Sequence, residues 1–566
     1  MPRTGAAVND RSPAGPLPIT DWLPRYRAAW LRPDLISGTT LAAYAVPDAL
    51  AYALLAGLPA QSGLYCYLVG GLVYAVFGTS RQLAIGPTSS ISLVVASSLG
   101  ALAAHDPGRA TALAGLAALL AGLISLGAWA MRWGSVVHFI SETVLTGFKI
   151  GAGLVIASTQ IPELLGIPAH GGGFFSTAQH LALHLGDSNP TALAIGVGSF
   201  ALLLAGQMLV PHWPIPLVAV ASAIMFSAAT HVGDRGVALV GSIPQGLPRL
   251  GVPALSLADT RNLLTLAVAS FLLAYVEGVS AARTFAAKHH YRVDTNQELL
   301  ALGAVNVAIG FAQGYPSAGG MSQSVVNDRG GAETPLAGAF ASVWIAVILL
   351  FLTGLFRSLP QAVLAALVLA SVTGLISVEE LRNLRRVSRT EFGLAMVTIV
   401  GVLVLGILQG VMVAAFLSLA LVIKAAASPS VSILGRVPGT RDFRDLDRHP
   451  DVEPIPRVLV IRPNAALVYF NAESVEERVL ELIAEQRTKL ARVVLDLSFS
   501  SAIDVSTARM LAGLHDELAE RGITLVLAET HHSVRELLDA ARLEETLRVP
   551  GRRISIADAI EQSARG

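Results

Sequence analysis

The chain has 566 residues, of which 53% are hydrophobic and only 14% are charged, and its mean hydropathy is +0.60. A soluble chain of this length needs more charge to cover its surface, so most of this sequence is expected to face lipid. The formal net charge is zero, which gives no indication of a nucleic-acid partner. A single cysteine, Cys66, excludes an intrachain disulfide and a thiolate metal cluster.

Composition changes sharply along the chain. Residues 1–34 are polar and rich in proline, and residues 35–428 form a nearly continuous series of apolar stretches. Charged residues return at the density of a soluble domain from about residue 450. We therefore expect an N-terminal cytoplasmic segment (1–34), a transmembrane domain (35–428), a linker (429–453) and a C-terminal soluble domain (454–566).

The predicted fold class of the middle zone is an all-α membrane domain, because a helix that crosses a bilayer needs about 20 apolar residues. On that measure the zone divides into about fourteen stretches, some shorter than a full span: 35–55, 62–78, 86–104, 110–131, 136–162, 192–209, 213–230, 262–282, 296–313, 318–328, 337–355, 360–376, 391–408 and 411–427. An even number of spans places both termini on the same side.

Loop charge indicates which side that is. Lys and Arg gather before the first stretch, after the eighth, and between the twelfth and thirteenth, which all fall on one face: Arg25, Arg27, Arg32, Arg283, Lys288, Arg292, Arg382, Arg385, Arg386 and Arg389. The long loop 163–191 falls on the other face and contains neither residue type. By the positive-inside rule both termini are cytoplasmic, although Arg109, Arg235, Arg249 and Arg261 fall outside.

Two short stretches, the third and the tenth, begin with a Gly/Pro break at matching places in the two halves. Helices broken at equivalent positions indicate a transporter site near the bilayer midplane. Free amides and the dipole at such a helix start attract an anion, and small side chains let it come close. The candidates are Thr88, Ser89 and Ser90 in one break and Gly319 and Gly320 in the other. The alternative is that each break is only a kink.

Glu277 lies inside the eighth stretch, where a carboxylate is costly and marks a functional site by default. Two roles are open for it: binding of Na⁺ or a proton, and a structural ion pair with Arg283 or Lys288 at the helix end. Asp48 follows Pro47, where a proline break would leave it hydrated. Lys149 is near enough to the inner end of its stretch to reach the interface.

The thirteen histidines show no ligand spacing, so no metal site is expected. His289 and His290, like His531 and His532, are expected at the surface.

Beyond residue 457 the pattern is that of a small α/β domain. Strands are predicted at 458–461, 466–470, 492–497 and 523–528, and helices at 473–486, from 506 onward and at 533–543. Asp504 is expected to cap the second of these helices, and Gly522 follows its end. The sequence contains no phosphate-binding glycine loop and no nucleophile–base pair, which favours an interaction module and argues against an enzyme.

These residues resemble the SulP family of anion transporters, the bacterial relatives of the SLC26 proteins, over almost the whole chain. The matching motifs are Leu31-Arg-Pro-Asp-Leu-Ile-Ser-Gly38, Val46-Pro-Asp-Ala-Leu-Ala-Tyr-Ala-Leu-Leu-Ala-Gly-Leu-Pro59, Gly63-Leu-Tyr65, Phe77-Gly-Thr-Ser-Arg81, Gly86-Pro-Thr88 and Ser322-Gln-Ser-Val-Val-Asn327. The C-terminal end resembles a STAS domain, in which Ile503-Asp-Val-Ser-Thr507 matches the loop before a helix.

The resemblance implies a seven-plus-seven inverted repeat, a core domain that moves against a gate domain, and a homodimer. It places the anion between the third and tenth helices and cation coupling at Glu277. In related STAS domains the residue at Ser506 or Thr507 is phosphorylated. The implied substrate-binding residues are Tyr52, Thr88, Ser89, Ser90, Gly319, Gly320, Met321, Ser322 and Gln323.

Two of these positions depart from the common family pattern. Many members carry Arg where this chain has Gln323, so a fixed positive charge is missing here, although some bicarbonate carriers also have Gln. The first-helix position that is often Gln is Asp48.

The sequence therefore predicts secondary active transport of a small inorganic anion of the sulfate or bicarbonate class, or a small dicarboxylate, in a bacterial inner membrane. The expected partners are the anion, the lipid bilayer, a second copy of the chain and a cytoplasmic partner of the STAS domain. No cofactor is expected apart from a coupled proton or sodium ion. The alternatives are uncoupled exchange or conduction through the same fold, a nucleobase carrier, and a membrane sensor that signals anion occupancy through STAS.

Overall fold

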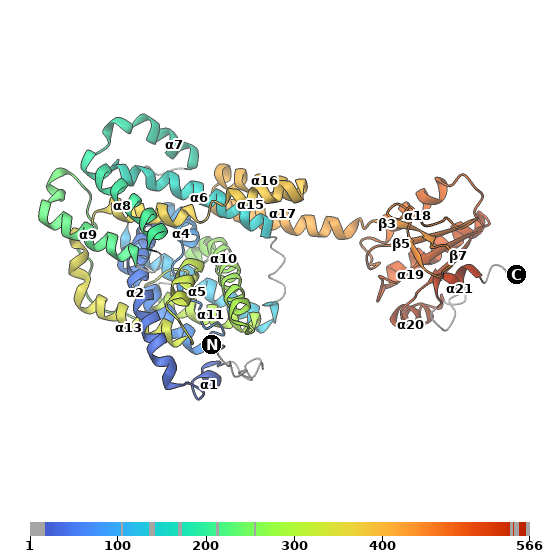
Figure 1. Ribbon diagram of the computed structural model, residues 1–566, viewed down its shortest axis with the longest axis horizontal. Coiled ribbons are helices and arrows are strands. Elements are labelled where there is room, and N and C mark those ends of the chain that lie inside the picture. The colour runs from blue at the N-terminus through green and yellow to red at the C-terminus, as the bar shows by residue number, and fades with distance from the viewer. Residues whose placement is uncertain are drawn as a thin grey trace. The chain divides into compact units, whose positions relative to one another are not determined.

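The computed structural model describes residues 17–103, 106–134, 142–167, 173–210, 214–253, 256–543, 547 and 554–561. The chain divides into two compact units, Met1–Ser418 and Leu419–Gly566. Figure 1 shows that the first unit is a bundle of helices and that the second contains a small sheet with helices around it. The predicted fold class, an all-α membrane domain followed by a small α/β domain, is confirmed.

The helices of the membrane unit follow the predicted stretches closely. They are α1 (Ile19–Trp22), α2 (Ala28–Leu55), α3 (Gln61–Phe77), α4 (Ser89–Leu102), α5 (Pro107–Ala130), α6 (Glu142–Leu165), α7 (Phe174–Leu183), α8 (Pro190–Leu209), α9 (Ile215–Thr230), α10 (Leu257–His289), α11 (Thr295–Phe311), α12 (Met321–Arg329), α13 (Leu336–Val347), α14 (Gln361–Thr373), α15 (Val378–Val387), α16 (Arg389–Leu405) and α17 (Ile407–Ala427). Residues 136–141, the start of the fifth stretch, lie outside the described residues. The helices α1, α7 and α15 fall outside the fourteen stretches.

Several segments are long and apolar enough to cross a membrane by themselves. Among the described residues they are Pro107–Ala130, Thr143–Leu165, Leu257–His289, Leu336–Ser358 and Gln361–Val387. Shorter apolar helices include Gln61–Phe77 and Ser89–Gly100. The short ones are possible inside a bilayer because irregular backbone next to them can be buried within protein or line a cavity.

Contacts between helices of the membrane unit recur between the helices that take the equivalent places in its other half. The helices α2, α3, α4, α5, α6, α8 and α9 correspond in order to α10, α11, α12, α13, α14, α16 and α17. α5 packs on α11, and their counterparts α13 and α3 also pack on each other. In the same way α2 packs on α13, and their counterparts α10 and α5 pack on each other. Likewise α6 packs on α16 as α14 packs on α8. This exchange is the contact pattern of two structural repeats related by an internal two-fold axis.

Glycines bring the exchanged helix pairs close together. A Cβ added to Gly310 of α11 would lie 2.8 Å from the carbonyl oxygen of Gly115 in α5. In the corresponding pair, a Cβ on Gly71 of α3 would collide with the carbonyl oxygen of Gly338 in α13. Small residues at such crossings let backbones touch, which is how membrane helices associate without a hydrophobic driving force.

The second unit is a five-stranded sheet in the order β4-β3-β5-β6-β7. The strands are β3 (Val431–Arg436), β4 (Phe443–Asp445), β5 (Val458–Pro463), β6 (Arg492–Asp496) and β7 (Thr524–Ala528). β5, β6 and β7 run parallel, whereas β3 is antiparallel to its neighbours.

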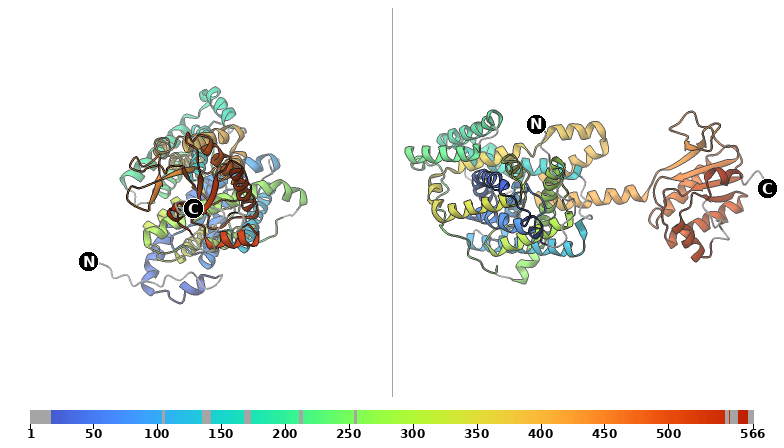
Figure 2. Two further views of the ribbon diagram at one scale, coloured as in Figure 1. Left: turned by 90° about the vertical axis from the view of Figure 1, so that its right-hand side faces the viewer. Right: turned by 60° about the horizontal axis from the view of Figure 1, so that its bottom comes forward.

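Helices cover both faces of this sheet (Figures 1 and 2). Leu459 and Ile461 point to the face covered by α18 (Ala472–Ala484), α19 (Val505–Glu520) and α20 (His532–Ala540). Val460, between them, points to the face covered by α21 (Ile556–Glu561). Side chains alternate along a strand, so a continuous apolar run such as Val458–Ile461 fits a strand that is covered on both sides.

Two predictions for this end of the chain are wrong. Residues 466–470 are not a strand, because their backbone groups are satisfied locally: Asn471 Oδ1 accepts from Val468 N–H (2.9 Å) and Asn471 Nδ2 donates to the Ala466 carbonyl oxygen (3.0 Å). The segment expected as a linker, 429–453, contains β3 and β4.

Candidate anion-binding site

The two interrupted spans meet at their broken ends. The two-residue strands β1 (Ile85–Gly86) and β2 (Ala318–Gly319) pair antiparallel, with Ile85 opposite Gly319 and Gly86 opposite Ala318. The N–H of Gly320 extends the pairing by donating to the carbonyl oxygen of Ala84 (3.2 Å). Helices α4 and α12 begin just after these strands, so their N-termini lie next to each other.

Neither helix start is capped by a side chain. The N-cap residues are Thr88 for α4 and Gly320 for α12, and neither makes a side-chain capping hydrogen bond. The first-turn amides of a helix have no partner within the helix. Each N-terminus carries roughly half a positive charge. Two such ends together therefore form a region that attracts an anion.

Buried polar atoms without hydrogen-bond partners lie around the two tips. Within the described parts of the chain these include Gln323 Oε1, Asp48 Oδ2 and Tyr67 OH. The three residues are 2%, 2% and 4% exposed. Most buried polar groups in proteins are hydrogen-bonded, so a cluster of unsatisfied ones indicates a place for a polar ligand.

Two of these side chains touch the tips directly. Gln323 lies across the opening, where its Nε2 donates to the carbonyl oxygen of Pro87 (3.2 Å). A Cβ on Gly320 would collide with Gln323 Oε1, and one on Gly86 would collide with the ring of Tyr67. The Gln323 and Tyr67 side chains therefore lie directly against the backbone of the two tips, and a larger residue at either glycine would displace them.

The two tips differ in accessibility. Ser89 and Ser90 are buried, at 8% and 5% exposed, whereas Met321 is 41% exposed and Ser322 is also exposed. The first turn of α12 is therefore more accessible than the first turn of α4.

Glu277 of α10 is directly bound to the start of α4, since Ser90 Oγ donates to Glu277 Oε1. Lys149 of α6 is half-buried, and its charge acts on the Glu277 carboxylate. Lys149 therefore lies near enough to Glu277 to act on its charge, which the sequence did not indicate. Arg283 and Lys288 were the two alternative structural partners of Glu277, and of these Lys288 binds Asp328, with Nζ 2.5 Å from Oδ2.

Asp48 is buried, so the expectation that Pro47 would leave it hydrated is wrong. α2 continues as a helix through Pro47, and the Asp48 side chain is enclosed. Tyr44, Asp48 and Tyr52 are four residues apart and lie on one face of α2. Tyr52 lies near Ser89 of α4 and Ser371 of α14, which places it beside the tips.

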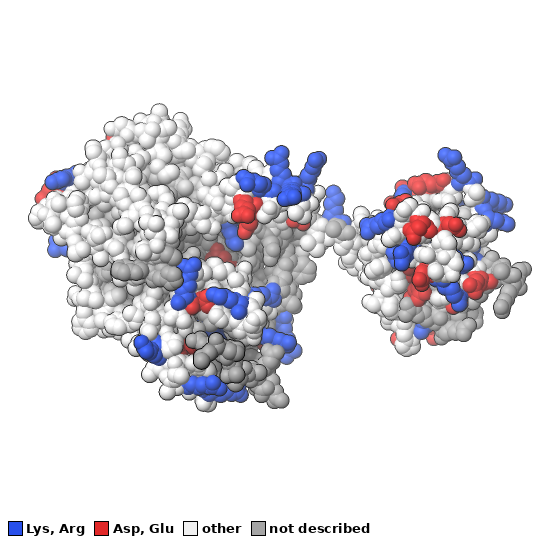
Figure 3. Space-filling view, in the orientation of Figure 1, with Lys and Arg blue, Asp and Glu red and all other residues white. Residues whose placement is uncertain are grey.

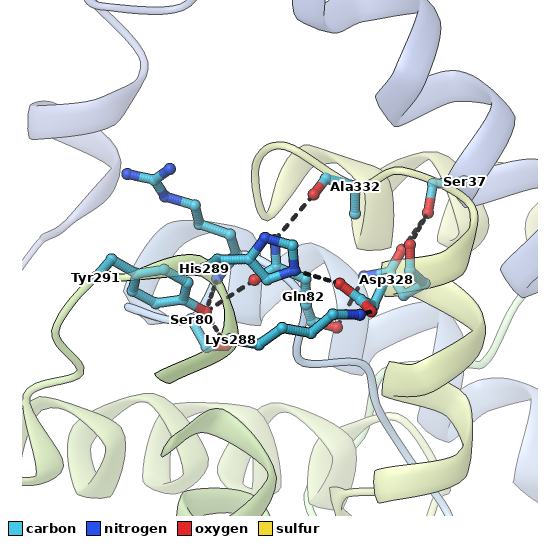
Figure 4. Close-up of polar contacts among 10 residues, drawn as sticks. Ser37, Ser80, Gln82, Lys288, His289, Tyr291, Asp328 and Ala332 are labelled. Carbon is cyan, nitrogen blue, oxygen red and sulfur yellow. Dashed lines mark hydrogen bonds and ion pairs between the residues drawn. The ribbon is translucent and has the colours of Figure 1, made fainter. Parts of the chain in front are cut away.

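The far end of α12 is fixed by a polar cluster that the sequence did not indicate. Figure 4 shows Lys288 and His289 reaching Asp328, each at 2.5 Å. Next to it, Ser37 Oγ donates to Asn327 Oδ1 (2.7 Å), and Asn327 Nδ2 donates to the carbonyl oxygen of Gln82 (3.0 Å). His289 is exposed, as predicted, and its ring also contacts Asp328.

Two other buried carboxylates are fully engaged in structural roles. Asp34 accepts hydrogen bonds from the amides of Glu333 (2.8 Å) and Thr334 (3.1 Å) and from the Thr334 hydroxyl (2.7 Å). Glu298 accepts from Tyr74 OH (3.0 Å) and from the amide (3.0 Å) and hydroxyl of Thr79 (2.5 Å). Both join loops to helices distant in sequence, which local patterns cannot indicate.

Charged side chains occupy restricted areas on the membrane unit. Figure 3 shows broad surfaces without charge and a blue cluster where α15 and the start of α16 lie. The arginines there are Arg382, Arg385, Arg386 and Arg389. No group of three or more His, Cys, Asp and Glu that could hold a metal ion occurs among the residues described.

In the second unit, Asp504 caps α19 as predicted. Its carboxylate accepts from the amides of Thr507 (2.8 Å) and Tyr469 (2.6 Å). Although burial acts in the opposite direction, these amides hold the pKa of Asp504 below its usual value. Ser506 is exposed and Thr507 is fully buried, so only Ser506 is accessible to a kinase in the folded domain.

A multi-pass helical unit in which two half-helices point their N-termini at one another defines a membrane transporter. Comparison with known proteins gives the particular family. Residues 31–398 match the Sulfate permease family, and residues 449–557 match the STAS domain. The chain belongs to the sulfate permease (SulP) family and is an anion transporter rather than an enzyme.

Similar proteins extend over the whole length. The probable sulfate transporter MT1781 of Mycobacterium tuberculosis (strain CDC 1551 / Oshkosh) is 36% identical over 92% of both chains. Sulfate transporter 4.1 of Arabidopsis thaliana, chloroplastic, is 31% identical over 96% of this chain and 82% of its own.

Solved structures show the same fold. The murine anion transporter Slc26a9 in its inward-facing state matches with a TM-score of 0.90 at 24% identity, over 100% of this chain and 97% of its own. The transmembrane domain of the cyanobacterial bicarbonate transporter BicA matches with a TM-score of 0.62 at 26% identity, over 69% of this chain and 98% of its own.

Proposed function

We propose that the protein carries a small inorganic anion of the sulfate or bicarbonate class by secondary active transport coupled to a cation. The observation that supports this most directly is the pairing of β1 with β2, which brings two uncapped helix N-termini together beside unsatisfied buried polar atoms. The relatives named above are described as sulfate transporters, and one structural neighbour is a bicarbonate transporter.

The anion would bind between the tips of α4 and α12. Free amides at both tips would supply most of the attraction, and hydroxyl groups would complete the contacts. The proposed binding residues are Tyr52, Thr88, Ser89, Ser90, Gly319, Gly320, Met321, Ser322 and Gln323.

Alternating access would come from movement of one group of helices past another. The core would contain α2–α5 and α10–α13, and the gate would contain α6, α8, α9, α14, α16 and α17. Lys149 of α6 and Ser371 of α14 lie on the gate side of this division, opposite Glu277 and Tyr52 on the core side. The site therefore lies where the two groups would move relative to each other.

Glu277 would couple transport to a proton or a sodium ion. It touches the site through Ser90 and faces Lys149 across the core–gate boundary. A carboxylate between a substrate-binding hydroxyl and a cation on the opposite group is placed to respond to both. We further propose a homodimer in a bacterial inner membrane with both termini and the STAS domain cytoplasmic, and regulation at Ser506.

The test is uptake of radiolabelled sulfate and bicarbonate into proteoliposomes, with and without an imposed proton or sodium gradient. We expect uptake to rise with at least one of these gradients in the native protein, and Glu277→Gln to lose the response to the gradient of the ion that Glu277 binds. The matched control is Glu163→Gln, because Glu163 lies about 21 Å along α6 from Lys149 at the helical rise. Uptake that ignores both gradients in the native protein would identify an uncoupled exchanger or channel.

A further inference from the structure

Two carboxylates lie beside the paired tips, and only one of them is compensated. Glu277 accepts a hydrogen bond from Ser90 and lies under the influence of the Lys149 charge. Asp48 is more enclosed than Glu277, at 2% exposed, yet its Oδ2 has no hydrogen-bond partner among the described residues. A buried ionised carboxylate without a partner is far more costly than a neutral one.

Among the residues that the structure describes, those on the helices packed around Asp48 include tyrosines and no cation near it. Tyr44 and Tyr52 flank it on α2, and Tyr67 approaches from α3 with an unpartnered hydroxyl. The helices α4, α9, α13 and α14, which also pack on α2, contain no charged residue within their bounds. On α12, the charged residues Asp328 and Arg329 lie at the end opposite to the tip.

The charge of the site therefore depends on Asp48. Two helix N-termini supply roughly one positive charge together, and Gln323 adds none. Glu277 and Lys149 offset each other. An ionised Asp48 would cancel the attraction of the helix ends, whereas a protonated Asp48 leaves it intact and adds a hydrogen-bond donor.

We propose that Asp48 is a proton-binding residue of the anion site, and that the anion binds only when this carboxyl group is protonated. The proton is taken up from the aqueous side from which the anion enters, is held on the Asp48 carboxyl group while the anion is bound, and leaves to water with it. This rests on the proposed function and deepens it, because it assigns a proton that accompanies the anion and is separate from the coupling role of Glu277.

The proposal predicts a characteristic pH dependence. If one proton must bind with the anion, the apparent dissociation constant rises about tenfold per pH unit once the solution pH exceeds the titration midpoint of the free site. Asp48→Asn replaces the protonated carboxyl group with a neutral amide that still donates a hydrogen bond. We expect this variant to bind the anion with an affinity that does not change between pH 5 and pH 9.

The experiment is calorimetric titration of the purified full-length protein with sulfate and with bicarbonate, in buffers of different ionisation enthalpy. The native protein should take up close to one proton per anion above the midpoint, and Asp48→Asn should take up none. Glu277→Gln, measured in parallel, should keep the proton uptake.

Three outcomes would overturn the proposal. They are proton uptake that persists in Asp48→Asn, uptake that disappears only in Glu277→Gln, and native protein that binds an anion without any proton. The last result needs no variant, so the proposal can be refuted even if Asp48→Asn fails to fold. Failure of the proposed function would look different, since the native protein would then bind and transport neither anion.

Discussion

The tips of α4 and α12 point at each other, but they are built differently. The α4 tip is buried and bound to a carboxylate, because Ser90 donates to Glu277. The α12 tip presents exposed Met321 and Ser322, and its helix is fixed at the other end through Asp328. The two spans therefore differ in what they present: the first turn of α12 is accessible, whereas the first turn of α4 is joined to Glu277.

The largest effect is expected from separating the tips. In Gly319→Val the added side chain meets Leu83, since a Cβ at Gly319 would already lie 2.7 Å from a Leu83 methyl group. We expect β1 and β2 to move apart and anion uptake to fall at least tenfold, which corresponds to about 1.4 kcal/mol. The measurement is radiolabelled uptake per folded protein in proteoliposomes.

The matched control is Gly100→Ala near the far end of α4, where an added Cβ meets no atom within 4 Å. It should keep native uptake. If Gly319→Val also transported at the native rate, close contact between the two tips would not be needed for transport.

The next largest effect is expected from breaking the interaction between Lys149 and Glu277, which tests the proposed coupling role of the residue joined to α4. Lys149→Met removes the positive charge that acts on Glu277, so we expect a lower melting temperature and slower uptake. In the double variant Lys149→Met/Glu277→Gln the loss of stability should be partly reversed, with a coupling free energy of about 0.5–3 kcal/mol between the two sites. Thermal unfolding of the native protein, the two single variants and the double variant in one detergent measures this coupling free energy. Strictly additive effects would show that Lys149 and Glu277 act independently.

A smaller effect is expected at the anchored end of α12. Asp328→Asn weakens the contacts to Lys288 and His289, and because the Lys288 side chain is 59% exposed we expect a loss of only about 1 kcal/mol of stability. Anion affinity should fall a few-fold, since the α12 tip is held less firmly. Lys288→Gln, which keeps the His289 contact, should have a smaller effect on both. Unchanged melting temperature in Asp328→Asn would contradict the anchoring role.

The smallest effect on transport is expected in the second unit. Asp504→Ala removes the cap of α19 and should cost about 1 kcal/mol locally, whereas Asp504→Asn keeps a capping side chain. Since the folded-state pKa of Asp504 is lowered, its contribution is present above its unfolded pKa of about 4 and is lost as pH falls through the folded value. Hydrogen exchange of Val505–Glu520 in the full chain measures both effects, and uptake should stay native.

Local chemistry explains what the sequence could predict. The two tips were identifiable because Gly, Pro and hydroxyl residues at a helix start form a short pattern that needs no knowledge of distant partners. The cap at Asp504 and the strands β6 and β7 were predictable for the same reason. The wrong strand at 466–470 shows the limit, because Asn471 satisfied that backbone through its side chain.

Long-range contacts explain what the sequence could not predict. Lys149 and Glu277 lie on helices from different halves of the unit, and Asp34 reaches the amide of Thr334. Helical periodicity predicts which face of a helix is buried but not which other helix packs against it. The partners of Glu277 and Asp34 could therefore not be predicted from the sequence. Asp48 was misplaced because proline was taken to break α2, whereas the structure continues the helix through it.

The most direct test of the central claim uses Ser322→Cys. Ser322 is exposed at the α12 tip, and the native Cys66 is buried, so a thiol reagent should modify only the new cysteine. If the two tips hold the anion, sulfate or bicarbonate should slow the modification in a saturable way, and should leave a control cysteine at Ser506 unaffected. Modification of Ser322→Cys at the same rate with and without saturating anion, in protein that still transports, would contradict binding between the tips.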